Sequence, residues 1–116
     1  MRERGTTFDT VREIGRELSG VEESTSYGTP ALKVNGKLVA RLKEDGESLV
    51  LVLGFDNRDI LMEANPEAFY ITEHYRGYPA LLAHLSRIDR AQLRDVLEMA
   101  YRFVIAKGKR KRAARK

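Results

Sequence analysis

Apolar residues recur at the three- and four-residue spacing of a helix in two long segments and one short one. The first helix is predicted over Thr7–Ser19, with Thr6 or Thr7 as its cap and Gly20 as its stop. A short helix is predicted between Asp56, its expected cap, and Asn65-Pro66. The last helix follows Asp89 and runs from Arg90 to about Lys107. The apolar positions that define these helices are Phe8, Val11, Ile14 and Leu18; Ile60, Leu61 and Ala64; and Leu93, Val96, Leu97, Ala100, Tyr101 and Val104.

The segments between these helices have the pattern of β-strands. Val21–Pro30 is rich in Ser and Thr and predicts a short irregular strand and a turn. Ser48–Leu53 is apolar without alternation, as expected of a central strand covered on both faces. Phe69–Glu73 and Ala80–Leu85 predict two further strands, joined through Arg76-Gly77-Tyr78-Pro79 as a hairpin.

Asn35-Gly36 is the strongest hairpin signal in the chain, between Ala31–Val34 and Lys37–Leu42. A two-residue turn would force Lys33 onto the same face as the apolar residues that follow the turn. A three-residue loop with Gly36 as a left-handed bulge avoids this, and we predict that loop. It gathers Leu32, Val34, Leu38, Ala40 and Leu42 on one face and leaves Lys33, Lys37, Val39, Arg41 and Lys43 on the other.

Runs of strands bracketed by helices indicate an α+β fold. We expect an antiparallel sheet of two hairpins plus a short strand, packed with the N-terminal, middle and C-terminal helices. The predicted organisation is a single domain over residues 1–107 and a disordered basic tail over 108–116.

Composition favours a cytoplasmic protein. The chain has 116 residues and no cysteine, which excludes disulfides and thiolate chemistry and is compatible with a reducing compartment. The first ten residues lack the apolar stretch of a signal peptide, and the longest apolar run, Leu49–Leu53, is far too short to span a membrane. We therefore expect no membrane association, and a monomer is favoured.

The charge is distributed unevenly. Seven of the 21 basic residues lie in 107–116, which contains no acid, so residues 1–106 keep 14 basic and 17 acidic residues and a net charge of −3. A terminal run of cations attracts phosphate groups whatever the fold, and it also complements the dipole at a helix end. Two interpretations of the tail therefore remain: it binds phosphate groups, or it only stabilises the end of the helix.

Residues with catalytic potential do not form a recognisable motif. His74 and His84 lie on strands predicted to pair, which suggests at most a weak two-histidine metal hypothesis, since a metal site needs three or four ligands. The hydroxyls of Ser24–Tyr27 have no identifiable base, and Asp56, Asp59 and Glu63 are explained by the start of a helix. We expect no enzyme activity, no cofactor and no metal.

Aromatic residues suggest a shallow pocket. Tyr27 and Pro30 are close in sequence, and Tyr70 is expected on the exposed face, opposite Phe69 and Ile71. Tyr27, Pro30 and Tyr70 are therefore the candidate pocket residues.

Two segments resemble the MmcQ/YjbR family: Leu18-Ser19-Gly20-Val21-Glu22-Glu23, and the stretch from Tyr27 to Lys37 that reads YGTPALKVNGK. Together with Tyr101 in the closing helix, the resemblance spans roughly residues 7 to 107. It implies a compact α+β fold with two hairpins likened to a double wing, and a role in DNA binding. It implies no catalytic residue. Tyr27 stands where the family often has tryptophan.

The expected function is a binding module that contacts DNA without sequence specificity, through the tail and the first hairpin. The alternative is a protein-interaction or small-ligand domain with no nucleic-acid role. The candidate nucleic-acid-binding residues are Lys33, Lys37, Arg41, Lys107, Lys109, Arg110, Lys111, Arg112, Arg115 and Lys116.

Overall fold

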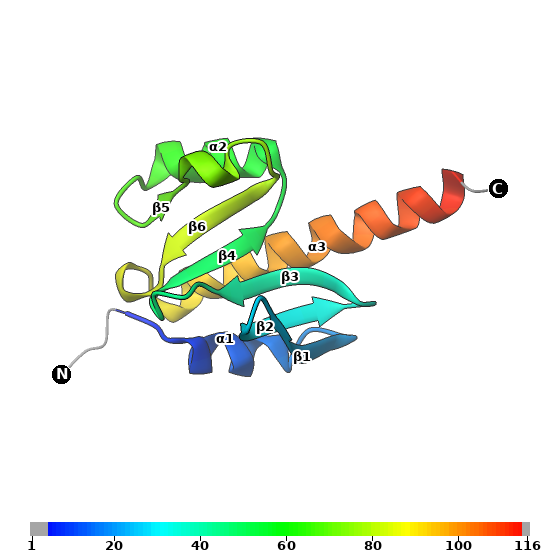
Figure 1. The fold of residues 1–116 in the computed structure, drawn as a ribbon, viewed down its shortest axis with the longest axis horizontal. Helices are drawn as coiled ribbons and strands as arrows, with labels where there is room; N and C mark the ends of the chain where they lie inside the picture. The colour runs from blue at the N-terminus through cyan, green and yellow to red at the C-terminus, as the bar shows by residue number, and fades with distance from the viewer. Residues whose placement is uncertain (1–4, 115–116) are drawn as a thin grey trace.

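The computed structural model describes residues 5–114, with side chains for residues 5–108. Three α-helices and a six-stranded antiparallel sheet form the α+β fold that the sequence predicts (Figure 1). The helices are α1 (Phe8–Gly15), α2 (Phe55–Ala64) and α3 (Arg90–Ala114). The strands are β1 (Val21–Ser26), β2 (Thr29–Val34), β3 (Lys37–Leu42), β4 (Ser48–Val52), β5 (Phe69–Tyr70) and β6 (Ala80–His84), with short 3-10 helices η1 (Glu73–Tyr75) and η2 (Leu85–Arg87).

The strand order is β1-β2-β3-β4-β6-β5, and every neighbouring pair is antiparallel. β4 lies between β3 and β6, as its unbroken apolar sequence predicts, and four of its five residues are buried. The sheet therefore has a well-covered middle and two edges, β1 and the two-residue β5.

The fold has two layers: the sheet, and the helices α1 and α3, which pack on one of its faces. In Figure 1, α3 passes behind β3 and β4 and projects beyond the sheet. Its apolar stripe, together with that of α1, packs against inward residues of the strands, while α2 packs beside β5 and β6. The largest fully buried side chains are Phe69, Ile14, Leu32, Leu49, Leu51, Leu53, Leu81, Leu82, Leu85, Ile88, Leu93 and Leu97.

The register predicted for the first hairpin is wrong. Asn35 and Gly36 form a two-residue turn with φ of 53° and 76°, and Val34 pairs directly with Lys37. The bulge lies inside β3 instead, because Leu32 pairs with Ala40 while Lys33 pairs with Leu38. The extra residue of that bulge is Val39.

The displaced bulge redistributes the side chains between the faces. Paired residues of an antiparallel sheet share a face, so Lys37 lies on the α3 side with Val34, and Leu38 lies on the opposite face with Lys33. Val39 turns inward and is fully buried, contrary to the prediction. Beyond the bulge the alternation resumes, and Arg41 pairs with Ala31 on the face that α1 and α3 leave uncovered.

Several predicted boundaries also change. β1 is a six-residue strand paired along its whole length with β2, and Tyr27-Gly28 forms the turn between them. The N-cap of α2 is Gly54 rather than Asp56, and Ile60, predicted to lie in the core, is 62% exposed. The predicted strand at Phe69–Glu73 ends at Tyr70 and is followed by η1.

The closing helix begins as predicted, because the Asp89 carboxylate accepts a hydrogen bond from the N–H of Gln92 at 2.8 Å. Its backbone stays helical to Ala114, beyond the predicted end at Lys107. The division into residues 1–107 and 108–116 stays a prediction. Within the described residues, no helix has the length and apolarity that a membrane span requires.

The position of the bulge is testable by a pair of truncations. Val39→Ala removes two methyl groups from the core, so we expect the free energy of unfolding to fall by about 2 kcal/mol. Leu38→Ala acts on the half-buried outer face and should cost less than about 1 kcal/mol. Urea unfolding measures both, and a larger cost for Leu38→Ala would contradict this register.

Candidate nucleic-acid interface

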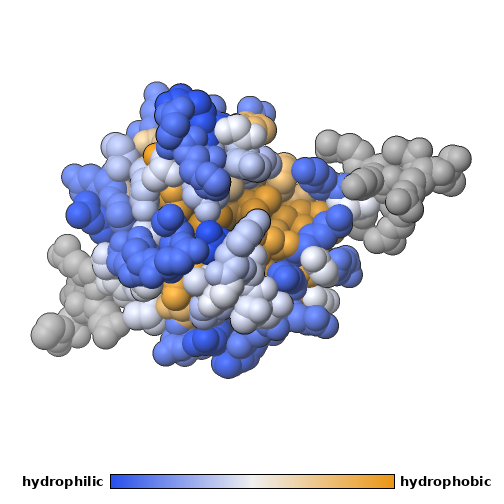
Figure 2. All heavy atoms as spheres, in the orientation of Figure 1, coloured by the Kyte–Doolittle hydropathy of each residue, from blue (hydrophilic) through white to orange (hydrophobic). Residues whose placement is uncertain are grey.

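The uncovered face of the sheet contains a groove of about 620 Å³. Figure 2 shows apolar residues gathered along the middle of this face, between rims of polar residues. The groove runs over β3, β4 and the start of β6, with the β1–β2 turn on one side and the segment 72–79 on the other. Its lining residues are Tyr27, Leu38, Arg41, Lys43, Glu44, Val50, Val52, Thr72, His74, Tyr75, Tyr78, Pro79 and Ala80.

Arg41 connects the two walls of this groove. Its side chain is only 8% exposed, and its guanidinium donates hydrogen bonds to Thr29 Oγ1 at 3.2 Å and to the Tyr75 hydroxyl at 3.2 Å. It also lies 5.0 Å from the ring centroid of Tyr27, a cation–π contact. The nearest carboxylate is that of the exposed Glu44, at 3.6 Å. The result is a rigidly held cation in an aromatic groove.

A second buried arginine holds the far wall in place. Arg58 of α2 donates from Nη1 to the carbonyl oxygens of Tyr75, Arg76 and Tyr78, at 3.4, 3.2 and 3.0 Å. Its guanidinium also stacks on Phe55, 4.8 Å from the ring centroid. These carbonyls belong to the turn that carries the groove tyrosines, so α2 positions them. The sequence gives no signal for this role, because Arg58 reads as an ordinary polar residue of a short helix.

Only one of the three predicted pocket residues lines the groove. Tyr27 is 83% exposed and stands at its rim. Pro30 pairs with Thr25 on β2, outside the lining. Tyr70, which we expected to be exposed, is half-buried, stacks on His84 at a centroid distance of 4.5 Å and hydrogen-bonds Ser48 at 2.8 Å.

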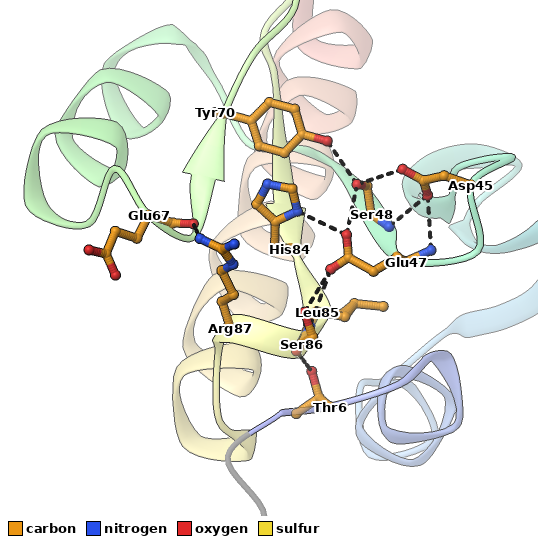
Figure 3. Close-up of polar contacts among 10 residues, drawn as sticks. All are labelled: Thr6, Asp45, Glu47, Ser48, Glu67, Tyr70, His84, Leu85, Ser86 and Arg87. Atoms are coloured by element: carbon orange, nitrogen blue, oxygen red, sulfur yellow. Dashed lines mark hydrogen bonds and ion pairs between the residues drawn. The ribbon is translucent and has the colours of Figure 1, made fainter.

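A polar cluster occupies the other end of this face (Figure 3). The carboxylate of Glu47 contacts His84 Nδ1 at 2.9 Å and accepts a hydrogen bond from the Ser86 hydroxyl at 3.0 Å. Asp45 accepts from the N–H of Glu47, and from the N–H and hydroxyl of Ser48, each at 2.9 Å. The cluster ties the β3–β4 turn to the end of β6.

Both carboxylates of this cluster are stabilised in the charged form. Partial burial raises the pKa of Glu47, but hydrogen bonds from His84 and Ser86 outweigh it and hold that pKa below its usual range. Burial likewise raises the pKa of Asp45, and the N–H groups of Glu47 and Ser48 with the Ser48 hydroxyl lower it further than burial raises it. The turn therefore depends on ionised acids.

The order of groups in this cluster differs from that of a nucleophilic triad. A triad places histidine between the nucleophile and the acid, whereas Glu47 lies between His84 and Ser48. Ser48 is also fully buried, at 0% exposure. The weak two-histidine hypothesis assumed that His74 lies on a strand paired with that of His84, but His74 lies in η1, where its ring contacts Tyr75. Among the residues with described placement, no group of three or more His, Cys, Asp or Glu side chains is arranged to hold a metal ion.

The cations predicted to share one face of the first hairpin lie on two different faces of the sheet. Lys33 and Arg41 lie on the groove side of the sheet, and Arg41 is buried. Lys37 instead lines a hollow of about 280 Å³ against α3, together with Phe103, Val104, Lys107 and Gly108. Leu38 and Val52 line both this hollow and the groove. The side chains of Lys109, Arg110, Lys111, Arg112, Arg115 and Lys116 lie outside the described residues.

The architecture defines a small α+β domain with an open, grooved sheet face. The sequence model of the YjbR family matches residues 16–103, and the protein belongs to this family, as the resemblance in the sequence predicts. The fold is similar to the crystal structure of Deinococcus radiodurans protein DR2400, described as a DUF419 domain. The TM-score is 0.74 at 20% identity, covering 92% of this chain and 83% of that one. A comparison with curated proteins finds no match.

The role of Arg58 is tested by Arg58→Leu. Removing the guanidinium takes the Arg58 donor from the Arg76 carbonyl, and leaves the carbonyls of Tyr75 and Tyr78 with only their backbone donors, so we expect the free energy of unfolding to fall by about 2 kcal/mol. Amide hydrogen exchange at residues 75–80 should become faster. Arg76→Leu is the control, because its side chain is 70% exposed and its ion pair with Glu73 is screened by solvent, so it should change stability little. Equal effects of the two variants would contradict the assignment.

The lowered pKa of Glu47 in the polar cluster predicts that the free energy of unfolding depends on pH. Because the folded-state pKa of Glu47 is lowered, its contacts stabilise the fold above the ordinary glutamate pKa of about 4.3, and this is lost as the pH falls through the folded-state value. As the pH falls below about 4.3, the free energy of unfolding should fall more steeply in the wild type than in Glu47→Gln. The exposed Glu63 supplies the control, Glu63→Gln, which should keep the wild-type slope. Urea unfolding at each pH measures this, and identical slopes for all three proteins would refute it.

Proposed function

We propose that this YjbR-family protein is a non-enzymatic module that binds nucleic acid without sequence specificity. The main contact is the basic end of α3, and the sheet groove next to it extends the binding surface. The observation that carries the proposal is the continuity of the two hollows, which share Leu38 and Val52. A polymer bound at the basic end would meet the aromatic groove next.

Charge supports this arrangement. The body of the protein is acidic overall, so attraction to phosphates is concentrated in the seven cations of residues 107–116. The α3 backbone carries Lys107 and the next four of them on its last turns. Lys37 and Lys107 line the same hollow, so the first hairpin adds a cation at the point where the helix leaves the sheet.

A second candidate function is a small-ligand domain. The observation that favours it is the groove itself, whose volume of about 620 Å³ falls in the range of small-molecule sites, roughly 300–1,000 Å³. In that case the cations of α3 would serve only to solvate the helix end and to complement its dipole. The two functions predict different effects of salt on the affinity for DNA.

The proposal is tested by fluorescence anisotropy with labelled single-stranded and duplex DNA across a range of salt. If all seven cations contact duplex phosphates, the slope of log affinity against log salt should approach about −6. A full-length variant with the seven cations changed to glutamine should lose most of that slope. A slope near zero in the wild type would overturn nucleic-acid binding and favour the small-ligand function.

A matched control separates local from general charge effects. Arg12 of α1 and Arg16, the C-cap of α1, both pair with Glu23, and α1 covers the face opposite the groove. The double variant Arg12→Gln, Arg16→Gln should leave the slope close to that of the wild type, because these cations are remote from the proposed surface. An equal loss of slope in this control would show that net charge alone governs binding.

A further inference from the structure

We propose that the sheet groove is a subsite for one unpaired nucleotide, whose base stacks on the groove tyrosines and whose phosphate is bound by Arg41 and Lys43. The ligand chemistry is an aromatic base with an attached phosphate, either in a single strand or as a free nucleotide. This inference deepens the proposed function and rests on it for the single-stranded source.

The first argument is the conformation of Tyr27. It has a φ of 55°, in a turn position that favours Asn, Asp or Gly, and yet it presents a large ring that is 83% exposed. The two-residue turn accounts for the left-handed backbone, and the cation–π contact with Arg41 leaves most of the ring exposed. A residue held in a disfavoured conformation points to function, and an exposed aromatic ring is the surface on which bases stack.

The second argument is the incomplete neutralisation of Arg41. Buried charges are normally paired, and Arg41 has one ion pair, with Glu44 at 3.6 Å, whose side chain is itself 63% exposed. The guanidinium has five N–H donors, and the hydrogen bonds found among residues 5–108 use three, to Thr29, Leu42 and Tyr75. Two donors remain for an anionic oxygen, in a guanidinium that is already fixed in position.

The third argument is the composition of the remaining walls. Tyr78 is 56% exposed, and its ring centroid lies 6.4 Å from that of Tyr75 and 6.0 Å from that of His74. The floor is apolar, formed by Leu38, Val50, Val52 and Ala80. Aromatic walls, an apolar floor and two cations at one side, Arg41 and Lys43, beside the exposed Glu44, match a base joined to a phosphate.

The test uses the full-length protein with three probes: a labelled ten-nucleotide oligothymidine, the duplex of the same length, and adenosine 5′-monophosphate. Tyr27→Asn removes the ring and keeps a residue that tolerates the turn. We expect it to weaken binding of the single strand about tenfold and to leave the duplex unchanged, because stacking contributes on that scale per base. Tyr78→Ala, on the other wall, should act in the same direction.

The controls and outcomes separate the sources of the nucleotide. Ile60→Ala removes an exposed apolar side chain of α2 outside the groove and should leave all three affinities unchanged. A loss confined to adenosine 5′-monophosphate would assign the groove to free nucleotides. Unchanged binding of both the strand and the mononucleotide in Tyr27→Asn and Tyr78→Ala would overturn the proposal.

Failure of this inference is distinguishable from failure of the proposed function. The glutamine variant of residues 107–116 tests the basic end of α3 through duplex binding, whereas the tyrosine variants test the groove through unpaired nucleotides. Inorganic phosphate serves as a further probe. If it competes with adenosine 5′-monophosphate at equal concentration, the base contributes nothing and the stacking subsite is refuted.

Discussion

The β-bulge at Val39 is the constraint on which the open face of this protein depends. Without it, the two-residue turn at Asn35-Gly36 would continue the alternation unbroken and would turn Arg41 into the core beneath α1 and α3. With the bulge, both Val39 and Ala40 lie in the core, and Arg41 returns to the outer face. Because of this one extra residue, the hairpin has both a two-residue turn at Asn35-Gly36 and an Arg41 side chain on the outer face of the sheet.

Two buried arginines then build a groove on the face that α1 and α3 leave uncovered. Arg41 links β3 to the β1–β2 turn and to Tyr75, and Arg58 holds the turn that carries Tyr75 and Tyr78. Each replaces part of the packing that a third layer would supply, because a guanidinium bonds to several oxygens at once. The walls are thus fixed by polar contacts over a small apolar floor, a construction suited to admitting a ligand.

The two ends of the outer face have different physical character. At the β4–β6 end, Glu47, Asp45 and Tyr70 satisfy one another and their neighbours, so the polar groups there stabilise a turn. At the other end, Tyr27 and Tyr78 remain exposed beside Arg41, and the groove opens toward the hollow beneath the end of α3. The exposed aromatic rings and the groove therefore lie together at one end of the face, and the satisfied polar groups lie at the other.

The amino-acid sequence was enough to predict the α+β class, the central place of β4, the Asp89 cap, the family and the concentration of charge at the end of α3, because each is a local or periodic signal. The register of β3 is known only from the three-dimensional structure, since alternation counted from the turn gives no sign of a bulge. The three-dimensional structure also decided that Arg41 is buried, that Tyr70 packs on His84 and that Arg58 holds a distant turn. These depend on contacts between residues far apart in the chain, where burial and hydrogen bonding override local preference.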